Sequence, residues 1–184
     1  MVKVVTPGKS GSHILFNALR GKVKLKSGDV SHDISPRGKQ DEQMKTIFIT
    51  ADPRMVVRKI FEAKKKGPSW WFSTHLRHMG ITPFYDWTIS DYLEKGKDLL
   101  LLEARYNAWV HIPRDPMALL VLYKDLWKES TWEKISKYLG INISGNIPAY
   151  VERKLDPITP KNEARLNLMY STLAENIEKD AKNA

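Results

Sequence analysis

The residues best suited to chemistry lie close to the N-terminus, in the stretch TPGKSGSHIL at positions 6–15. The β-branched run VKVVT at positions 2–6 predicts a short buried strand, and the residues that follow predict a helix over 12–19. A strand, a glycine-bearing turn and a helix start point backbone N–H groups outward, and the helix dipole adds partial positive charge there. Lys9 adds a full positive charge to the same turn. This pattern predicts a binding site for an anion such as phosphate.

The spacing of this turn differs from the Walker A pattern, in which a further glycine precedes the glycine of the glycine–lysine pair by five residues. The pair here is Gly8–Lys9, so that glycine would fall at position 3, which is Lys3. We therefore do not interpret the turn as a Walker loop. Two interpretations remain at this point: a cradle for an anion, and an ordinary strand-to-helix turn that carries an exposed lysine.

The composition is that of a globular protein, since 42% of the 184 residues are hydrophobic and 28% are charged. This length suits a single domain over residues 1–184. The absence of cysteine excludes disulfides, thiolate metal sites and a cysteine nucleophile. The first residues lack the apolar segment of a signal peptide, and the run LLLL at positions 99–102 is too short to span a bilayer. We expect a cytoplasmic protein without a membrane partner.

The net charge of +9 favours polyanions, phosphorylated ligands or acidic surfaces as partners. A generally basic, solvated surface is the plainer interpretation of the same charge. The sequence contains no zinc-finger spacing, RNP-like aromatic motif or basic zipper, so nucleic acid is not the expected partner.

Short apolar runs alternate with helical patterns along the chain, which predicts an α/β fold in three layers around a central, mostly parallel sheet. The expected strands cover positions 2–6, 45–50 and 118–123, with one further short strand around 30–34. The expected helices cover 12–19, 53–66, a short stretch after 88, 99–112, 130–140 and a long segment from 160 onward. The aromatic stretch 67–87 is expected to be irregular. Sites in such sheets lie beyond the carboxyl ends of the strands.

Polar residues follow each of the three clearest strands. Lys9 and Ser10 follow the first, Asp52 and Arg54 follow the second, and the segment from Tyr123 follows the third. Asp52 is also placed to cap the helix that begins at the proline after it. The sequence therefore predicts that the edge formed by these strand ends carries the functional site.

The turn TPGKSGSHIL resembles the loop of the PAPS-dependent sulfotransferases, which usually reads PKSGTTW and binds the 5′ end of 3′-phosphoadenosine 5′-phosphosulfate (PAPS). Other stretches resemble further parts of the same family in the same order. They are VSHDIS (30–35), TIFITADPRMVVRKIF (46–61), DWTISDYLEKG (86–96), LLVLYKDLWKESTWEKISKYLGI (119–141) and AYVERKLDPITPKNEARLNLMY (149–170). The resemblance thus covers most of the chain and implies a P-loop-like strand–turn–helix at the N-terminus.

The resemblance implies a sulfotransferase that moves a sulfuryl group from PAPS to a hydroxyl or amine acceptor, with 3′,5′-adenosine bisphosphate (PAP) as product and no metal. Lys9 would stabilise the leaving 5′-phosphate, and His32 would act as general base. The acceptor would be a small molecule or a glycan. The residues implied to bind the donor are Lys9, Ser10, Gly11, Ser12, His13, Arg54, Lys59, Tyr123, Arg153 and Lys154.

The chain departs from the family pattern mainly where the donor's 3′-phosphate would bind. The family arginine of that site falls on Ala51, and the serine eight residues later falls on Lys59. Ile14 takes the place of the tryptophan that flanks adenine, and Leu155 that of the glycine in the RKG loop. Arg54, Arg58 or Lys59 are the candidates to supply the missing charge.

Two other functions remain open from the sequence: a P-loop-like kinase that uses ATP, and an inactive domain that binds a polyanion or nucleic acid. His75 and His78 are three residues apart, but two histidines without a third ligand do not predict a metal site. Trp70 and Trp71 are expected in the core or at the lip of an acceptor pocket. Neither the acceptor nor the oligomeric state follows from the sequence.

Overall fold

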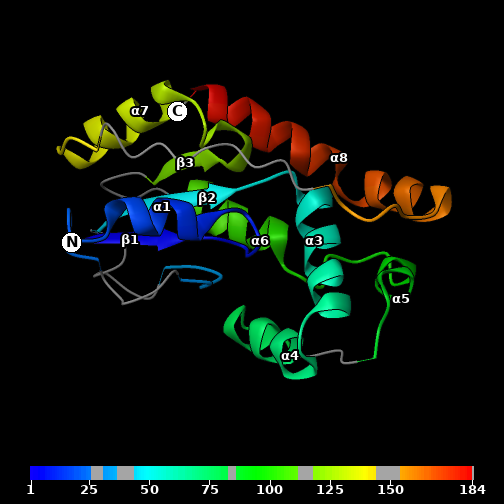
Figure 1. Cartoon of the computed structure of the whole chain (residues 1–184). Coiled ribbons are helices and arrows are strands. Elements are labelled where there is room, and N and C mark those ends of the chain that lie inside the picture. Colours follow the sequence, from blue (N-terminus) through cyan, green and yellow to red (C-terminus); the bar gives the residue numbers. More distant parts are fainter. Residues whose placement is uncertain (26–30, 37–43, 83–85, 112–117, 144–153, 184) are drawn as a thin grey trace.

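The computed structural model describes residues 1–25, 31–36, 44–82, 86–111, 118–143 and 154–183. Its sheet has three parallel strands in the order β1, β2, β3 (Figure 1). Their bounds are β1 Val2–Val5, β2 Lys45–Thr50 and β3 Leu119–Leu122. The predicted α/β class, with a parallel sheet, is confirmed. Each strand was predicted from a short apolar run, and each is buried on both faces as such runs indicate.

Helices alternate with the strands in the part of the chain that the structure describes. They are α1 Ser12–Leu19, α3 Pro53–Lys66, α4 Ser69–His78, α5 Ile89–Glu94, α6 Leu102–Tyr106, the π-helical turn η1 Asn107–His111, the 3₁₀ turn η2 Tyr123–Asp125, α7 Glu129–Leu139 and α8 Pro160–Asn183. No helix in these segments is long and apolar enough to cross a membrane.

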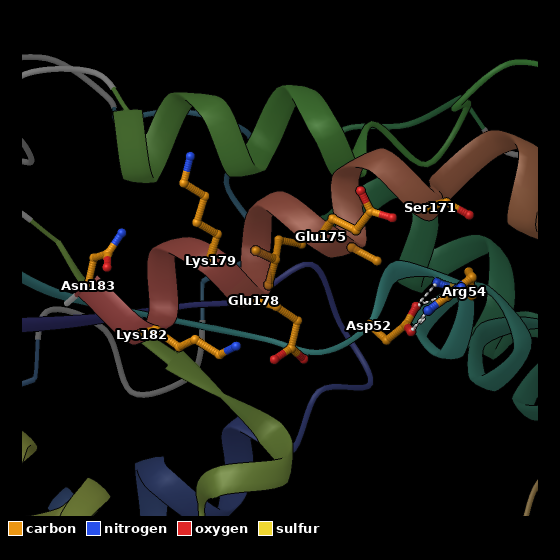
Figure 2. Close-up of a pocket in the computed structure, with 10 residues that line it drawn as sticks. Asp52, Arg54, Ser171, Glu175, Glu178, Lys179, Lys182 and Asn183 are labelled. Atoms are coloured by element: carbon orange, nitrogen blue, oxygen red, sulfur yellow. Dashed lines mark hydrogen bonds and ion pairs between the residues drawn. The ribbon is translucent and has the colours of Figure 1, made fainter.

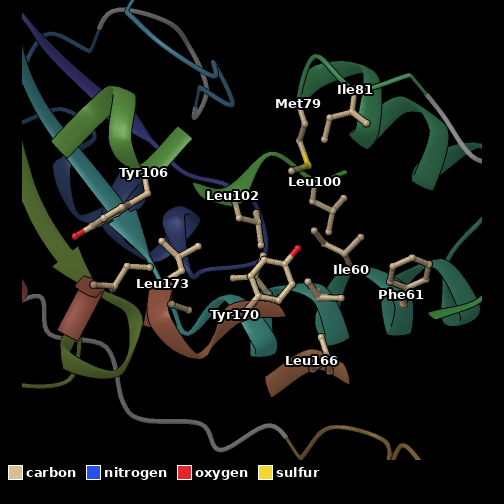
Figure 3. Close-up of a cluster of buried hydrophobic side chains, with 14 of the residues drawn as sticks. Ile60, Phe61, Met79, Ile81, Leu100, Leu102, Tyr106, Leu166, Tyr170 and Leu173 are labelled. Atoms are coloured by element: carbon tan, nitrogen blue, oxygen red, sulfur yellow. The ribbon is translucent and has the colours of Figure 1, made fainter. Parts of the chain in front are cut away.

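The two faces of the sheet bury two separate apolar clusters, so the fold has three layers. Side chains alternate between the faces of a strand. On β2, Ile47 and Ile49 pack with helices α1 and α7, whereas Phe48 packs on the opposite face with α3, α4, α6 and α8. Figure 3 shows part of this second cluster, in which Leu102 and Tyr170 approach Ile60 of α3.

Segments that follow β1 in the chain pair with both of its edges. Leu25 forms a parallel bridge with Val2, and Ser31 forms one with Val5, on the edge of β1 that faces away from β2. After β1 the chain therefore passes first to one side of this strand and later returns to the other side as β2. The carboxyl end of such a strand is the place where open α/β sheets bind ligands. Residues 26–30 lie outside the described residues. Of the strand predicted around 30–34, the described residues show the bridge at Ser31.

The stretch 67–87 was predicted to be irregular, and this prediction is wrong for residues 69–78, which form helix α4. Pro68 precedes the helix without a side-chain cap, so the usual start signal is missing from the sequence. Burial of Phe72, Leu76 and Met79 against α3 and the sheet supplies the stability instead. This helix carries His75 to the end of β1.

Candidate anion-binding site

The turn between β1 and α1 is held in an unusual backbone conformation by its own hydroxyl groups. Gly8 and Lys9 both have positive φ, at 94° and 51°, and Gly11 has φ 75°. The backbone N–H of Gly8 donates to Thr6 Oγ1 at 3.1 Å, and the Thr6 and Ser10 hydroxyls share a short hydrogen bond. Successive backbone N–H groups in a turn can form a concave nest that binds an anion.

Ser10 fastens the turn to the sheet, because its Oγ donates to the carbonyl of Ile49 in β2 at 3.2 Å. Its side chain is fully buried. Ser10 was predicted to bind the donor, and its hydroxyl here holds the loop's shape. Backbone groups of the loop, rather than this hydroxyl, are therefore the donors that the turn presents to a ligand.

The N-terminus of α1 directs positive potential at the same turn. Gly11 is the N-cap and provides no side-chain acceptor, and the first turn of the helix contains no acidic residue. An anion close to the first turn is stabilised by the helix dipole under these conditions. Of the predicted side-chain donors of this turn, Ser12 is buried and His13 is exposed.

The charged group of Lys9 lies on the α4 side of the turn. Lys9 Nζ is 4.0 Å from the centroid of the Trp71 ring, a cation–π contact. The Trp71 ring in turn stacks on His75, with the centroids 4.7 Å apart and the planes 16° from parallel. Helix α4 thus provides an aromatic wall beside the loop. Trp70 projects into solvent with 64% of its surface exposed, so it belongs to neither the core nor this wall.

His32 lies on the same side of the loop as this wall. Its Nδ1 donates to the carbonyl of Thr6 at 3.0 Å, since a carbonyl can only accept. This bond selects the tautomer with the proton on Nδ1, which leaves the lone pair of the neutral ring on Nε2. The His32 and His75 rings meet edge to face, with centroids 5.2 Å apart. Lys9 and His32, which the sequence singled out, are therefore brought to one loop.

His75 was not predicted to belong to the site. It is about nine-tenths buried, and its Nε2 has no hydrogen-bond partner. This nitrogen lies against the loop: a Cβ on Gly8 would be only 2.6 Å from it. Burial lowers the pKa of His75 to about 3, and the charges of His32, Lys9, His78 and Arg105 add to the effect. His75 is therefore a neutral imidazole at physiological pH.

Arg105 of α6 fixes the two segments that carry the histidines. It is completely buried, and its guanidinium donates to four backbone carbonyls, so each segment is tied to the same side chain. The acceptors are His32 O at 3.1 Å, Asp33 O at 3.3 Å, Met79 O at 2.9 Å and Leu100 O at 3.3 Å. Burial lowers the pKa of Arg105 to about 10, which still leaves it charged at neutral pH.

A second buried charge supports the backbone next to His32. Lys3 of β1 forms an ion pair with Asp33 at 2.8 Å, and its ammonium lies 5.0 Å from the Trp109 ring centroid. Trp109 Nε1 also donates to the Asp33 carbonyl at 3.0 Å. Because Asp33 follows His32 directly, these contacts restrict the position of the imidazole as well.

On the other side of the loop lies Tyr123, which was predicted to stand near the adenine of the donor. Its ring packs against Gly11 so closely that a Cβ there would be 2.4 Å from the ring. Lys59 Nζ lies 4.1 Å from the same ring's centroid. Tyr123 of η2 therefore lies next to the turn between β1 and α1, and Lys59 of α3 contacts the ring of Tyr123, although both residues are far from the turn in sequence.

Arg54, one of the three residues predicted to supply the charge of the family's 3′-phosphate arginine, is engaged elsewhere. Arg54 forms a two-pronged ion pair with Asp52 and donates to Asn167 Oδ1 at 3.0 Å. Figure 2 shows this pair at the edge of a cavity of about 510 Å³, whose other wall is the C-terminal half of α8. Lys154 is exposed, and Arg153 lies outside the described residues.

The lining of this cavity carries both signs of charge. Asp52, Glu175 and Glu178 provide three carboxylates, and Arg54, Lys179 and Lys182 provide three cations. Glu178 is further paired with Lys124 at 2.6 Å. A cavity with equal numbers of fixed charges offers no net attraction to a phosphate.

Comparisons with known proteins yield no match to a family model, to a curated protein or to a solved structure. Among the residues that the structure describes, no group of three or more His, Cys, Asp or Glu side chains could hold a metal ion.

Proposed function

We propose that this protein is a sulfotransferase that takes a sulfuryl group from PAPS and gives it to a hydroxyl or amine. One observation carries the proposal: Lys9 and His32, the two residues to which the resemblance gives catalytic roles, meet at one anion-binding turn. His32 Nδ1 donates to Thr6 O at the start of that turn, and Lys9 lies within it. The lysine would face the leaving group and the histidine the acceptor.

The transfer itself needs charge stabilisation and a base. The acceptor oxygen or nitrogen forms a bond to sulfur while the bond between sulfur and the bridging oxygen of the donor breaks. Lys9 stabilises the negative charge that develops on the leaving 5′-phosphate, together with the N–H groups of the loop. Nε2 of His32 takes the acceptor's proton, because Nδ1 already carries a proton.

The residues present fit the two ends of the donor unequally. The 5′ end has a left-handed loop, a helix N-terminus and Lys9. At the 3′ end, Ala51 offers no charge, and Arg54 is already paired with Asp52. The proposal therefore concerns a protein that binds its donor mainly through the 5′ half.

Thermal unfolding in the presence of PAP tests this proposal. A ligand that binds only the folded protein, at a hundred times its dissociation constant, adds about 2.7 kcal/mol to the free energy of unfolding. For a chain of this length, that corresponds to a rise in Tm of roughly 5–10 °C. The absence of any shift at millimolar PAP would overturn the proposal. 5′-AMP should give nearly the same shift as PAP if the 3′-phosphate contributes little.

Lys9→Ala provides the matching test of the loop. It should abolish PAP binding and turnover while the fold is retained, because the lysine lies in a turn and contributes to no apolar core. Lys97→Ala is the control, since Lys97 is an exposed lysine between α5 and α6. Turnover by Lys9→Ala at the rate of the control would contradict the role of Lys9 in stabilising the leaving group.

A second candidate is phosphoryl transfer from ATP, which the engagement of Arg54 favours because ATP has no 3′-phosphate. Competition between ATP and PAP separates the two functions. Displacement of PAP by micromolar ATP, with no discrimination in favour of PAP, would support the kinase over the sulfotransferase.

A further inference from the structure

His75 has a buried nitrogen for which the described residues provide no partner. A buried polar atom that forms no hydrogen bond destabilises the folded protein. Nε2 of His75 is such an atom, and its ring is about nine-tenths buried. The loop lies immediately beside it, since a Cβ at Gly8 would be 2.6 Å from Nε2. This nitrogen therefore borders a turn that combines left-handed residues, a helix N-terminus and a lysine.

The surroundings fix the direction in which His75 points. Trp71 stacks on the ring, and His32 meets it edge to face. Arg105 holds the end of α4 through the Met79 carbonyl at 2.9 Å and holds the His32 backbone as well. Because the ring is restrained on several sides, Nε2 stays directed at the loop.

We propose that His75 is a further binding residue of this site: its Nε2–H donates a hydrogen bond to an oxygen of a tetrahedral oxyanion that is bound by the turn of residues 8–12. The ligand class is a sulfate, a sulfonate or a phosphate group. The assignment deepens the proposed function, and it rests on that function only for the identity of the molecule that carries the oxyanion.

An anion at this place also changes the proton equilibrium of His75. The charged groups that act on the ring are Lys9 from the loop, His32 from the segment after the Ser31 bridge, Arg105 from α6 and His78 on its own helix, and all of them disfavour a positive His75. A bound dianion opposes these charges, so it raises the pKa of His75 above its value of about 3. The complex then takes up protons more readily than the free protein, and affinity for sulfate increases as pH falls.

Inorganic sulfate is the probe, because it remains a dianion across the range from pH 5 to pH 8. Sulfate is titrated at constant ionic strength into the full chain, and its binding is followed through the imidazole ¹⁵N resonances. His75→Leu should weaken sulfate binding about 10- to 100-fold, the range expected for a hydrogen bond to a charged group. His75→Gln keeps a side-chain N–H donor and should recover most of the affinity.

His78→Leu is the matched control, since His78 is an exposed histidine on the same helix, three residues further on. It should bind sulfate with the affinity of the wild type. Unchanged sulfate affinity in His75→Leu would overturn the inference. If His75→Leu fails to fold, the wild-type spectrum decides instead: a His75 Nε2 resonance that does not respond to saturating sulfate would contradict the assignment.

Repeating the titrations with PAP separates this inference from the proposed function. Sulfate binding that depends on His75, without any PAP binding, would support the role of His75 and contradict the proposed sulfotransferase function. PAP binding that depends on Lys9 but is unaffected by His75→Leu and His75→Gln would support the proposed function and contradict the binding role of His75.

Discussion

Gly8 illustrates how a single residue shapes the turn between β1 and α1. Its φ of 94° lies in the region that favours glycine. The His75 ring lies so close that a Cβ at this position would be 2.6 Å from Nε2. Two separate requirements therefore coincide at this position: a left-handed backbone and close approach of an imidazole.

Gly8→Ala should be more destabilising than the same change at another left-handed glycine. Gly21 has φ 77°, and nothing lies within 4 Å of an added Cβ, so Gly21→Ala should cost only the backbone term of about 1–2 kcal/mol. Gly8→Ala adds the clash with His75 Nε2 and should cost at least about 1 kcal/mol more. Denaturant unfolding of both variants measures the difference. Equal losses would mean that the His75 contact is not close in solution.

The sequence predicted the polar residues of the site but not the geometry that joins them. Lys9 and His32 were identified because they match a motif. His75 was considered only as half of a metal pair with His78, because the stretch around it was predicted to be irregular. The spacing of Leu76 and Met79 around His75 is the signal that could have placed it on the buried face of a helix.

At the scale of elements, local signals decided which boundaries could be predicted. The bounds of α1, β2 and α3 agree with the sequence-based expectation. For α3 the signals are local, because the Asp52 side chain accepts from the Arg54 N–H and Gly67 follows the last turn. The expected helix 99–112 instead begins at Leu102 and continues as a π-helical turn from Asn107. Tertiary contacts explain this difference, since Arg105 and Trp109 both donate to the Asp33 carbonyl.

Arg105 is the residue on which the arrangement of these elements depends most. Arg105→Lys retains the charge, but an ammonium has three donors and cannot reproduce the planar fork that reaches four carbonyls. We expect a loss of about 3 kcal/mol in the free energy of unfolding, because buried carbonyls are left unpaired. Urea unfolding of Arg105→Lys measures this loss.

Arg165→Lys is the control for that measurement, because Arg165 forms a partly exposed ion pair with Glu94 at 3.2 Å. Exposed pairs contribute roughly 0–1 kcal/mol, so this variant should remain close to the wild type. The His32 and His75 ¹⁵N resonances should shift in Arg105→Lys and not in the control. A stable Arg105→Lys with unchanged histidine resonances would contradict the positioning role of Arg105.

At the scale of the whole molecule, the three layers and the site depend on each other. The cluster between the sheet and helices α3, α4, α6 and α8, part of which Figure 3 shows, includes Leu76 and Met79 from the segment that carries His75. The sequence did not predict that Lys3 and His75 would be buried beside this cluster. The partners of Lys3 include Asp33 and Trp109, which lie far from it in the chain, so they follow from the tertiary fold rather than from local sequence.

Such a buried histidine makes the stability of the whole chain depend on pH. The pKa of His75 is about 3 in the folded protein and 6.5 when unperturbed, so the unfolded state binds more protons between these values. The contribution of His75 to stability is therefore present above pH 6.5 and is lost as pH falls through the folded-state pKa. Between pH 7 and pH 5 the expected loss is about 2 kcal/mol, since each pKa unit corresponds to 1.36 kcal/mol.

His75→Gln removes this titration while keeping a polar side chain of similar reach. Urea unfolding at pH 7 and pH 5 should show a wild-type loss that is greater than that of the variant by about 2 kcal/mol. His78→Gln should retain the wild-type dependence, because it changes an exposed residue and leaves His75 in place. Equal pH dependence in wild type and His75→Gln would mean that this ring titrates in the folded protein as it does in water. That result would contradict the burial of His75 beside the loop.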